Sequence, residues 1–268
     1  MKFLLPSLRL LAFLVAQAAT VYSNAAVLVI GHRGNSLHAP ENTIAALRAC
    51  SNKAEMVEFD VRVSKDGHLV LMHDWNVDRT TDGNGAVSNL TLVEIKALDA
   101  GSWFSTNFVG EKVPTLEEAL TNVLQFATPL VERKAGPAPK FVETFRRLGA
   151  VTNILLQSFD WAFLAEVHAL EPRIRLSALG NEDLTEAKLR EIIKTGARIV
   201  AWERSKLDGA QIELVQRAGL KVFVWTVDDP HEIERFIRLG VDGIISNDPA
   251  TVMRVRAQLT VRPAAVGE

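Results

Sequence analysis

The chain has 268 residues, of which 48% are hydrophobic and 23% are charged, which is enough apolar material for one domain with a full core. Its 30 basic and 32 acidic residues give a formal net charge of -2. This balance excludes the broad basic surface that binding to a nucleic-acid backbone requires, so we expect no nucleic-acid partner.

The first 25 residues differ from the rest of the chain. Lys2 and Arg9 precede the apolar run Leu10 to Ala16, and small residues then lead to Ser23-Asn24-Ala25. This order is typical of a secretory signal peptide cleaved after Ala25, with Ala16-Gln17-Ala18 as a competing cleavage site. The run is shorter than the about 20 apolar residues of a membrane-spanning helix. We therefore predict a signal peptide over 1–25, export to the periplasm or medium, and a mature chain, 26–268, without stable membrane insertion.

From Val27 onward, short β-rich runs alternate with amphipathic helical patterns. Eight runs are predicted as buried strands: 27–30, 56–61, 130–132, 154–156, 174–176, 198–201, 222–225 and 243–245. Two predicted helices begin near Pro114 and at Asp229-Pro230, and others end at Gly149, Gly196, Gly219 and Gly240. Repeated strand-helix units predict parallel strands with right-handed crossovers, so we expect an α/β fold, a (β/α)₈ TIM barrel. An open doubly wound sheet is the structural alternative.

Residues 75–112 interrupt this alternation. The segment is rich in Gly, Asn, Asp, Ser and Thr, and it contains one short helical pattern, 90–98. We predict an insertion after the second strand. Because long loops of such barrels cluster at the end where chemistry takes place, this insertion is a candidate for substrate selection.

Three acidic residues lie on predicted strands. The two-residue period of a strand places Glu58 and Asp60 on one face of 56–61 and apolar residues on the other, so both carboxylates point into the barrel. In Val131-Glu132-Arg133-Lys134, Glu132 and Lys134 also share a face. Carboxylates about 7 Å apart repel one another in a low-dielectric interior, and a shared cation removes that repulsion. Three carboxylates predict one divalent cation, Ca²⁺ or Mg²⁺ rather than zinc. Solvated charges at a strand edge are the plainer alternative.

Two histidines follow predicted strands. Gly31-His32-Arg33-Gly34 comes directly after the first strand, and His73-Asp74 follows a further β-like run, 69–72, that pairs with 56–61 through a turn at Asp66-Gly67. Reactive loops of a barrel occupy these positions. We expect His32 and His73 to flank the cation, with Arg33 and Lys134 available to bind a phosphoryl oxygen.

Several other polar and aromatic residues have structural explanations. Asn42 and Thr43 precede a helical pattern and are expected to cap it. Trp202 and Trp225 end strands and are expected in the core, and Cys50 is expected to be a buried thiol. The remaining histidines are expected to lie outside the site: His38, His68, His168 and His231.

The ordered set of motifs resembles the glycerophosphodiester phosphodiesterase family. The resemblance begins with His32-Arg33-Gly34, Pro40-Glu41-Asn42-Thr43 and Glu58-Phe59-Asp60, and it extends in order over nearly the whole mature chain. Its later motifs are Asp66-Gly67, His73-Asp74, Arg79 to Gly83, Val113 to Glu118, Gln157 to Asp160, Trp225-Thr226-Val227 and Val241-Asp242-Gly243.

This resemblance implies a (β/α)₈ barrel that hydrolyses glycerophosphodiesters to glycerol 3-phosphate and an alcohol. It implies that His32 and His73 are the general acid and base, that Glu58, Asp60 and Glu132 bind the metal, and that Arg33 and Lys134 bind phosphate. Arg133 departs from the family pattern, because an apolar residue usually occupies this outward position. Three alternatives remain: a lysophospholipase D, a sphingomyelinase D-like enzyme, or a non-catalytic phosphodiester-binding protein.

Overall fold

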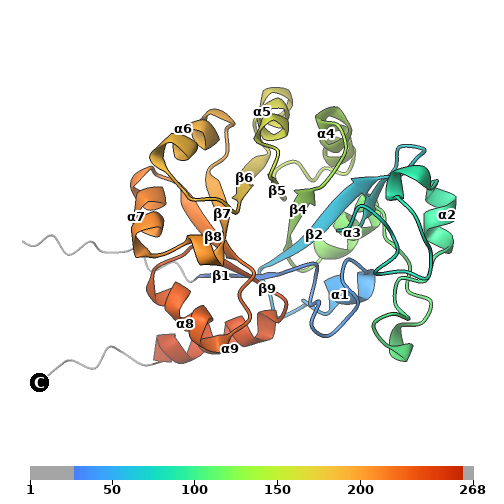
Figure 1. Ribbon diagram of the computed structural model, residues 1–268, viewed down its shortest axis with the longest axis horizontal. Helices are drawn as coiled ribbons and strands as arrows, with labels where there is room; N and C mark the ends of the chain where they lie inside the picture. The colour runs from blue at the N-terminus through green and yellow to red at the C-terminus, as the bar shows by residue number, and fades with distance from the viewer. Residues whose placement is uncertain (1–26, 262–268) are drawn as a thin grey trace, which may run out of the picture.

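Nine strands alternate with helices in the computed structural model, which describes residues 27–261 (Figure 1). The strands are β1 (Leu28–Gly31), β2 (Met56–Val63), β3 (Leu69–Leu71), β4 (Thr128–Arg133), β5 (Leu155–Ser158), β6 (Arg175–Gly180), β7 (Ile199–Glu203), β8 (Lys221–Trp225) and β9 (Gly243–Ser246). The signal peptide predicted for 1–25 lies outside the described residues.

The strands close into a barrel. The sheet runs β1-β9-β8-β7-β6-β5-β4-β2, and β1 pairs in parallel with both β9 and β2. This double pairing excludes the open sheet that was the structural alternative. The short β3 lies outside the ring and pairs antiparallel with β2, as the turn at Asp66-Gly67 predicted. The closed parallel barrel and its extra strand confirm the predicted fold class.

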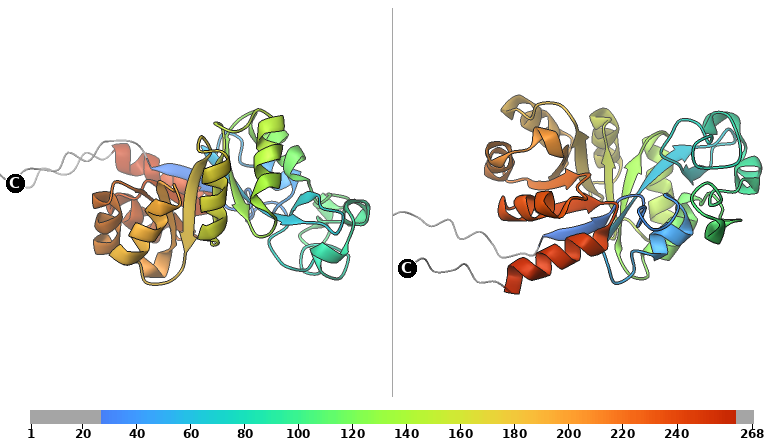
Figure 2. Two further views of the ribbon diagram at one scale, coloured as in Figure 1. Left: turned by 90° about the horizontal axis from the view of Figure 1, so that it is seen from above. Right: turned by 60° about the horizontal axis from the view of Figure 1, so that its bottom comes forward.

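Helices surround the barrel between successive strands, as Figures 1 and 2 show. They are α1 (Ile44–Arg48), α3 (Leu116–Val123), α4 (Ala138–Arg147), α5 (Trp161–Leu170), α6 (Glu186–Lys194), α7 (Gly209–Arg217), α8 (Pro230–Arg238) and α9 (Pro249–Val261). The helix predicted near Pro114 begins at Leu116, because Thr115 is its cap and forms a capping box with Glu118. Each helix within residues 27–261 is too short or too polar to cross a bilayer.

Two cores meet at the barrel wall. A large outer core packs the outward strand residues against the helices. Inside the barrel, each of the eight ring strands contributes one buried apolar residue to a separate cluster: Ile30, Met56, Leu130, Leu155, Leu179, Ala201, Phe223 and Ile245. The next inward residues along β2, β4 and β5 are Glu58, Glu132 and Gln157. The interior therefore changes from apolar to polar toward the carboxyl ends of the strands, where barrel enzymes place their sites.

The segment 75–112 lies at one side of the barrel, beyond β2 and β3 (Figure 1). It contains η1 (Val87–Asn89), α2 (Leu92–Ala97) and η2 (Thr106–Phe108), and α2 falls within the helical pattern 90–98. A small core of its own fixes the segment against β3: Val70, Met72, Val77, Val87, Ile95, Ala100 and Val113. The segment is thus an ordered part of the fold.

Candidate active site

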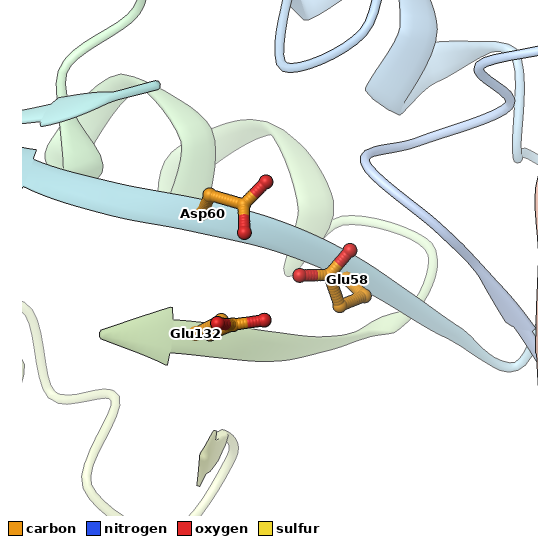
Figure 3. A group of neighbouring side chains, drawn as sticks. All are labelled: Glu58, Asp60 and Glu132. Atoms are coloured by element: carbon orange, nitrogen blue, oxygen red, sulfur yellow. The ribbon is translucent and has the colours of Figure 1, made fainter. Parts of the chain in front are cut away.

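Three carboxylates meet inside the barrel, from two neighbouring strands. Glu58 and Asp60 lie on β2 and Glu132 on β4, and the strand register places Asp60 beside Glu132 (Figure 3). One oxygen from each carboxylate lies within 4.8 Å of the others, and all three side chains are buried. The two-residue strand period therefore brings the three predicted metal ligands together.

Each of these carboxylates has one buried oxygen without a well-formed hydrogen bond. Within residues 27–261, Glu58 Oε1 has no hydrogen-bond partner, and Asp60 Oδ1 and Glu132 Oε1 have an ion-pair contact with Lys134 in place of one. Buried polar atoms normally find such partners, because an unsatisfied carboxylate oxygen in a protein interior is costly. A divalent cation with oxygen ligands at about 2.0–2.6 Å would satisfy all three atoms at once. The donor set therefore fits a hard divalent cation.

Electrostatics of the cluster support the same conclusion. Burial, followed by repulsion from Asp60, raises the pKa of Glu132 to about 7, and burial also raises the pKa of Glu58 well above its usual range. Burial alone would raise the pKa of Asp60 too, but Lys134 and Arg33 outweigh it and lower that pKa to about 2. The protein's own cations thus outweigh burial at Asp60, whereas burial and the neighbouring carboxylates outweigh them at Glu58 and Glu132.

Two cationic side chains border the carboxylates. The ammonium of Lys134 contacts Glu132 and lies 3.2 Å from Asp60 Oδ1. The guanidinium of Arg33 lies 3.4 Å from Asp60 Oδ2 and donates a hydrogen bond of 2.9 Å to Glu41. Both side chains line the same cavity as Glu58 and Glu132, which places them where a bound anion would meet them.

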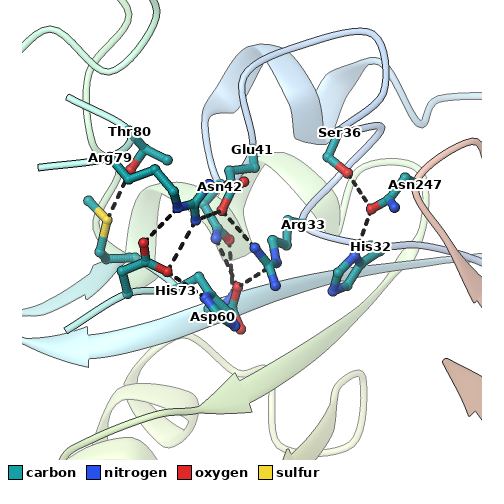
Figure 4. Close-up of polar contacts among 12 residues, drawn as sticks. His32, Arg33, Ser36, Glu41, Asn42, Asp60, His73, Arg79, Thr80 and Asn247 are labelled. Carbon is teal, nitrogen blue, oxygen red and sulfur yellow. Dashed lines mark hydrogen bonds and ion pairs between the residues drawn. The ribbon is translucent and has the colours of Figure 1, made fainter. Parts of the chain in front are cut away.

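Asn42 belongs to this cluster and does not cap a helix, so the sequence prediction for it was wrong. Thr43 is the N-cap of α1, as expected. Asn42 has a φ of 58° and turns inward, where its Nδ2 donates to Asp60 Oδ2 at 2.9 Å and its Oδ1 accepts from the Asp60 backbone N–H at 3.0 Å. The first bond orients the carboxylate of Asp60, and the second fixes the amide of Asn42 on the backbone of β2 (Figure 4). Asn42 is therefore a positioning residue.

The imidazole of His32 is held by an amide. Its Nδ1 lies 2.7 Å from Asn247 Oδ1, which also accepts a hydrogen bond from Ser36. Asn247 Nδ2 donates to Asp228 at 2.7 Å, so the amide oxygen must face His32. This arrangement places the hydrogen on Nδ1 and leaves the lone pair on Nε2. Burial, then repulsion from Arg33, lowers the pKa of His32 to about 4.

The imidazole of His73 is held by a carboxylate. Its Nδ1 lies 2.7 Å from Asp74 Oδ1, and Asp74 accepts from Arg79 Nε at 2.6 Å. Arg79 also donates to Glu41, which pairs with Arg33 (Figure 4). Burial lowers the pKa of His73 even though Asp60 and Asp74 favour its charged form. One network of alternating charges therefore connects this histidine to the carboxylate cluster.

Six of the seven predicted site residues line one cavity of about 180 Å³ at the mouth of the barrel, and the seventh, Asp60, is buried beside Glu132. Its polar wall contains both imidazoles, Arg33, Lys134 and two of the carboxylates, and its apolar wall includes Phe159, Leu179 and Trp225. Trp225 was expected in the core, but it lines the cavity because β8 ends there. Trp202 is buried as expected. The four histidines predicted to lie outside the site are not among the residues that line this cavity: His38, His68, His168 and His231.

Arg133, the departure from the family pattern, is accommodated outside the barrel. Its guanidinium lies 4.7 Å from the centre of the Phe163 ring and donates to Asp160 at 2.9 Å and to the Gly136 carbonyl at 3.0 Å. Asp160 in turn is the N-cap of α5. The flat guanidinium thus fills an apolar position by stacking, and Glu132 and Lys134 keep their inward direction.

A model of the glycerophosphoryl diester phosphodiesterase family matches residues 32–251. The chain is 37% identical to a glycerophosphodiester phosphodiesterase of Caldanaerobacter subterraneus, over 85% of this chain and 97% of that protein. It is 33% identical to a glycerophosphodiester phosphodiesterase of Bacillus subtilis, over 93% of this chain and 95% of that protein.

Solved structures agree with these sequence matches. A phosphodiesterase of Oleispira antarctica, determined in complex with the product sn-glycerol-3-phosphate, superposes with a TM-score of 0.80 at 29% identity, covering 86% of this chain and 96% of that one. A glycerophosphodiester phosphodiesterase of Agrobacterium tumefaciens superposes with a TM-score of 0.76 at 30% identity, covering 85% and 99%.

Proposed function

The chain belongs to the glycerophosphoryl diester phosphodiesterase family, whose reaction is the hydrolysis of glycerophosphodiesters, and we propose that it uses one divalent cation and a pair of histidines for this reaction. The products are glycerol 3-phosphate and an alcohol. The observation that carries the proposal is a cluster of three buried carboxylates, two of which line one cavity together with two oriented imidazoles.

Glu58, Asp60 and Glu132 would hold the cation, Ca²⁺ or Mg²⁺. When bound there, the cation supplies positive charge to the phosphoryl oxygens of the diester. Arg33 and Lys134 add two further positive charges from the same wall. A phosphodiester is anionic, so an attacking oxygen must approach negative charge. Offsetting the negative charge of the phosphodiester with these positive charges is expected to be the largest contribution to the rate.

His32 and His73 provide the two proton transfers. Each has its Nδ1 hydrogen engaged by an acceptor, so each presents Nε2 to a reacting group. One imidazole takes the proton of the attacking hydroxyl as the new P–O bond forms. The other, when it is protonated on Nε2 as well, donates that proton to the departing alkoxide as the old P–O bond breaks. Each such proton transfer is expected to raise the rate on the order of 10²- to 10⁴-fold.

The insertion 75–112 favours small diesters over lysophospholipids, because it leaves little room for an acyl chain. The space that this segment shares with the barrel beside His73 is only about 10 Å³, next to a site cavity of about 180 Å³. A lysophospholipid held by the insertion would need a continuous apolar groove there. The glycerol 3-phosphate bound in the Oleispira antarctica protein is consistent with a small substrate.

The test is hydrolysis by the purified mature chain, 26–268, after chelation and again after adding back Ca²⁺ or Mg²⁺ singly. We expect turnover of glycerophosphocholine to disappear with the chelator and to return with one of these metals. Faster turnover of lysophosphatidylcholine would instead identify a lysophospholipase D. If His32→Ala and His73→Ala left the rate unchanged, the proposed chemistry would be wrong. Export is part of the proposal, and fractionation of expressing cells tests it.

A further inference from the structure

A second cavity adjoins the catalytic one at the mouth of the barrel, between the ends of α5 and α6. It measures about 310 Å³ and shares two lining residues, Phe159 and Leu179, with the catalytic cavity. Its other walls come from the start of α5, the loop after β6, the end of β7 and one face of α6. A substrate bound at the carboxylates can therefore extend into it past Phe159.

Indole rings form a fixed apolar wall of this second cavity. Trp161 Nε1 donates to the Leu179 carbonyl at 3.0 Å, and Trp202 Nε1 donates to the Glu182 carbonyl at 2.6 Å. The two ring centres lie 6.3 Å apart. Gly180 permits this packing, since a Cβ there would lie 2.1 Å from the Trp202 ring. Trp202 is buried and holds Trp161 in place, whereas Trp161 is only partly buried, so the apolar ring face of Trp161 remains for contact with a ligand.

The charges of the second cavity are opposite in sign to those that face the phosphate. Glu182 pairs with Lys188 at 2.7 Å, whereas Glu191 makes no ion pair with any residue between 27 and 261. The three charged side chains therefore sum to -1. On the other side of Phe159, the ammonium of Lys134 lies 5.9 Å from its ring centre. Phe159 thus lies between Lys134, a proposed phosphate ligand, and an aromatic cavity whose charged side chains are net acidic.

We propose that this second cavity binds the cationic head group of the leaving alcohol, and that its preferred ligand is a quaternary ammonium. The proposal rests on the proposed function, which places the phosphodiester at the carboxylates. A diester with a quaternary ammonium alcohol carries a negative charge on its phosphate and a positive charge on its head group. The catalytic cavity would bind the phosphate, and the adjoining second cavity would bind the head group. Aromatic faces with a nearby carboxylate are the usual protein partners of such cations.

The first test compares two diesters, glycerophosphocholine and the uncharged-head-group diester glycerophosphoglycerol. Glu191→Gln removes the unpaired charge from an exposed helix position, and Trp161→Ala removes one aromatic face. We expect each change to lower kcat/KM for glycerophosphocholine roughly 3- to 30-fold. The kcat/KM for glycerophosphoglycerol should stay within about twofold of the wild-type value. Glu166→Gln, an exposed change on α5 outside the cavity, is the matched control. Equal losses for both diesters, or no loss for either, would overturn the proposal.

The second test separates this proposal from the proposed function. Choline alone is titrated into the full mature chain, and the quenching of tryptophan fluorescence is followed. We expect saturable quenching that weakens in Glu191→Gln. Choline binding without turnover of any diester would support this cavity and refute the proposed function. Turnover without choline binding and without preference between the two diesters would refute this cavity and leave the proposed function in place.

Discussion

Replacing Glu132 by Gln is expected to stabilise the cation-free protein at alkaline pH and to remove most of the stabilisation that cations give. The carboxylate lies in the barrel interior beside Asp60 and Lys134, and burial raises its pKa from an ordinary 4.5 to about 7. A carboxylate whose pKa is raised on folding favours the folded state while it is protonated. That contribution is complete below pH 4.5 and is lost as the pH rises through about 7.

The magnitude follows from the two pKa values. Their difference, at about 1.4 kcal/mol per pH unit, corresponds to on the order of 3 kcal/mol at pH 8. The amide of Gln resembles the protonated acid and cannot ionise, so the variant avoids this loss and Lys134 keeps Asp60 as a partner. For a domain of this size, the gain corresponds to roughly 5 to 10 °C in Tm.

The assay is thermal unfolding of chelated protein at pH 4.5 and pH 8, repeated with saturating Ca²⁺ or Mg²⁺. The variant should match the wild type at pH 4.5, exceed it at pH 8, and lose most of the rise in Tm that cation binding gives the wild type. Glu166→Gln, an exposed change, should alter none of these values beyond about 0.5 kcal/mol. An equal cation-induced rise in the variant and the wild type would refute the assignment of Glu132 as a ligand.

Three further outcomes are expected. Asn42→Ala should weaken cation affinity about 10- to 100-fold, because it frees the carboxylate of Asp60, and cation titration of Tm will measure this. Asp74→Asn should lower kcat about 100-fold with little change in KM, because His73 loses the carboxylate that orients it, and steady-state kinetics that show a change in KM alone would contradict this role. Cys50 should resist alkylation in the native protein, because burial raises its pKa to about 12, and mass spectrometry should detect adducts only after unfolding.

Local periodicity predicted those parts of the site that regular strands position. Alternation along β2 fixed the inward direction of Glu58 and Asp60, and the same rule applied to Glu132 and Lys134 on β4. The structure brings Glu58, Glu132 and Lys134 to one cavity mouth with both histidines, and it places Asp60 beside Glu132. Their chemical roles stay predictions until the variants are measured.

The parts that the sequence did not predict depend on contacts between distant segments. Asn42 reaches Asp60 across 18 residues, and its position before α1 offered a sufficient local explanation as a cap. Asn247 reaches His32 across 215 residues, which no local pattern could indicate. For Trp225, the strand itself was predicted correctly, but the residue is the last of β8. The last inward position of this strand lies at the cavity and not in the core.

The position of the carboxylates along the strands links cation binding to the stability of the fold. On β2 the inward side chain changes from Met56 to Glu58 to Asp60, so the cluster rests directly on the buried apolar layer inside the barrel. Such a layer excludes water and strengthens every charge interaction above it. This low dielectric would increase the affinity for a cation. It also makes the ionised carboxylates lower the stability of the fold more strongly when no cation is bound. A polar substitution beneath them, such as Met56→Gln, should therefore weaken cation affinity and narrow the difference in Tm between cation-bound and cation-free protein. If affinity were unchanged, the carboxylates alone would determine it, and the apolar layer would serve only the fold.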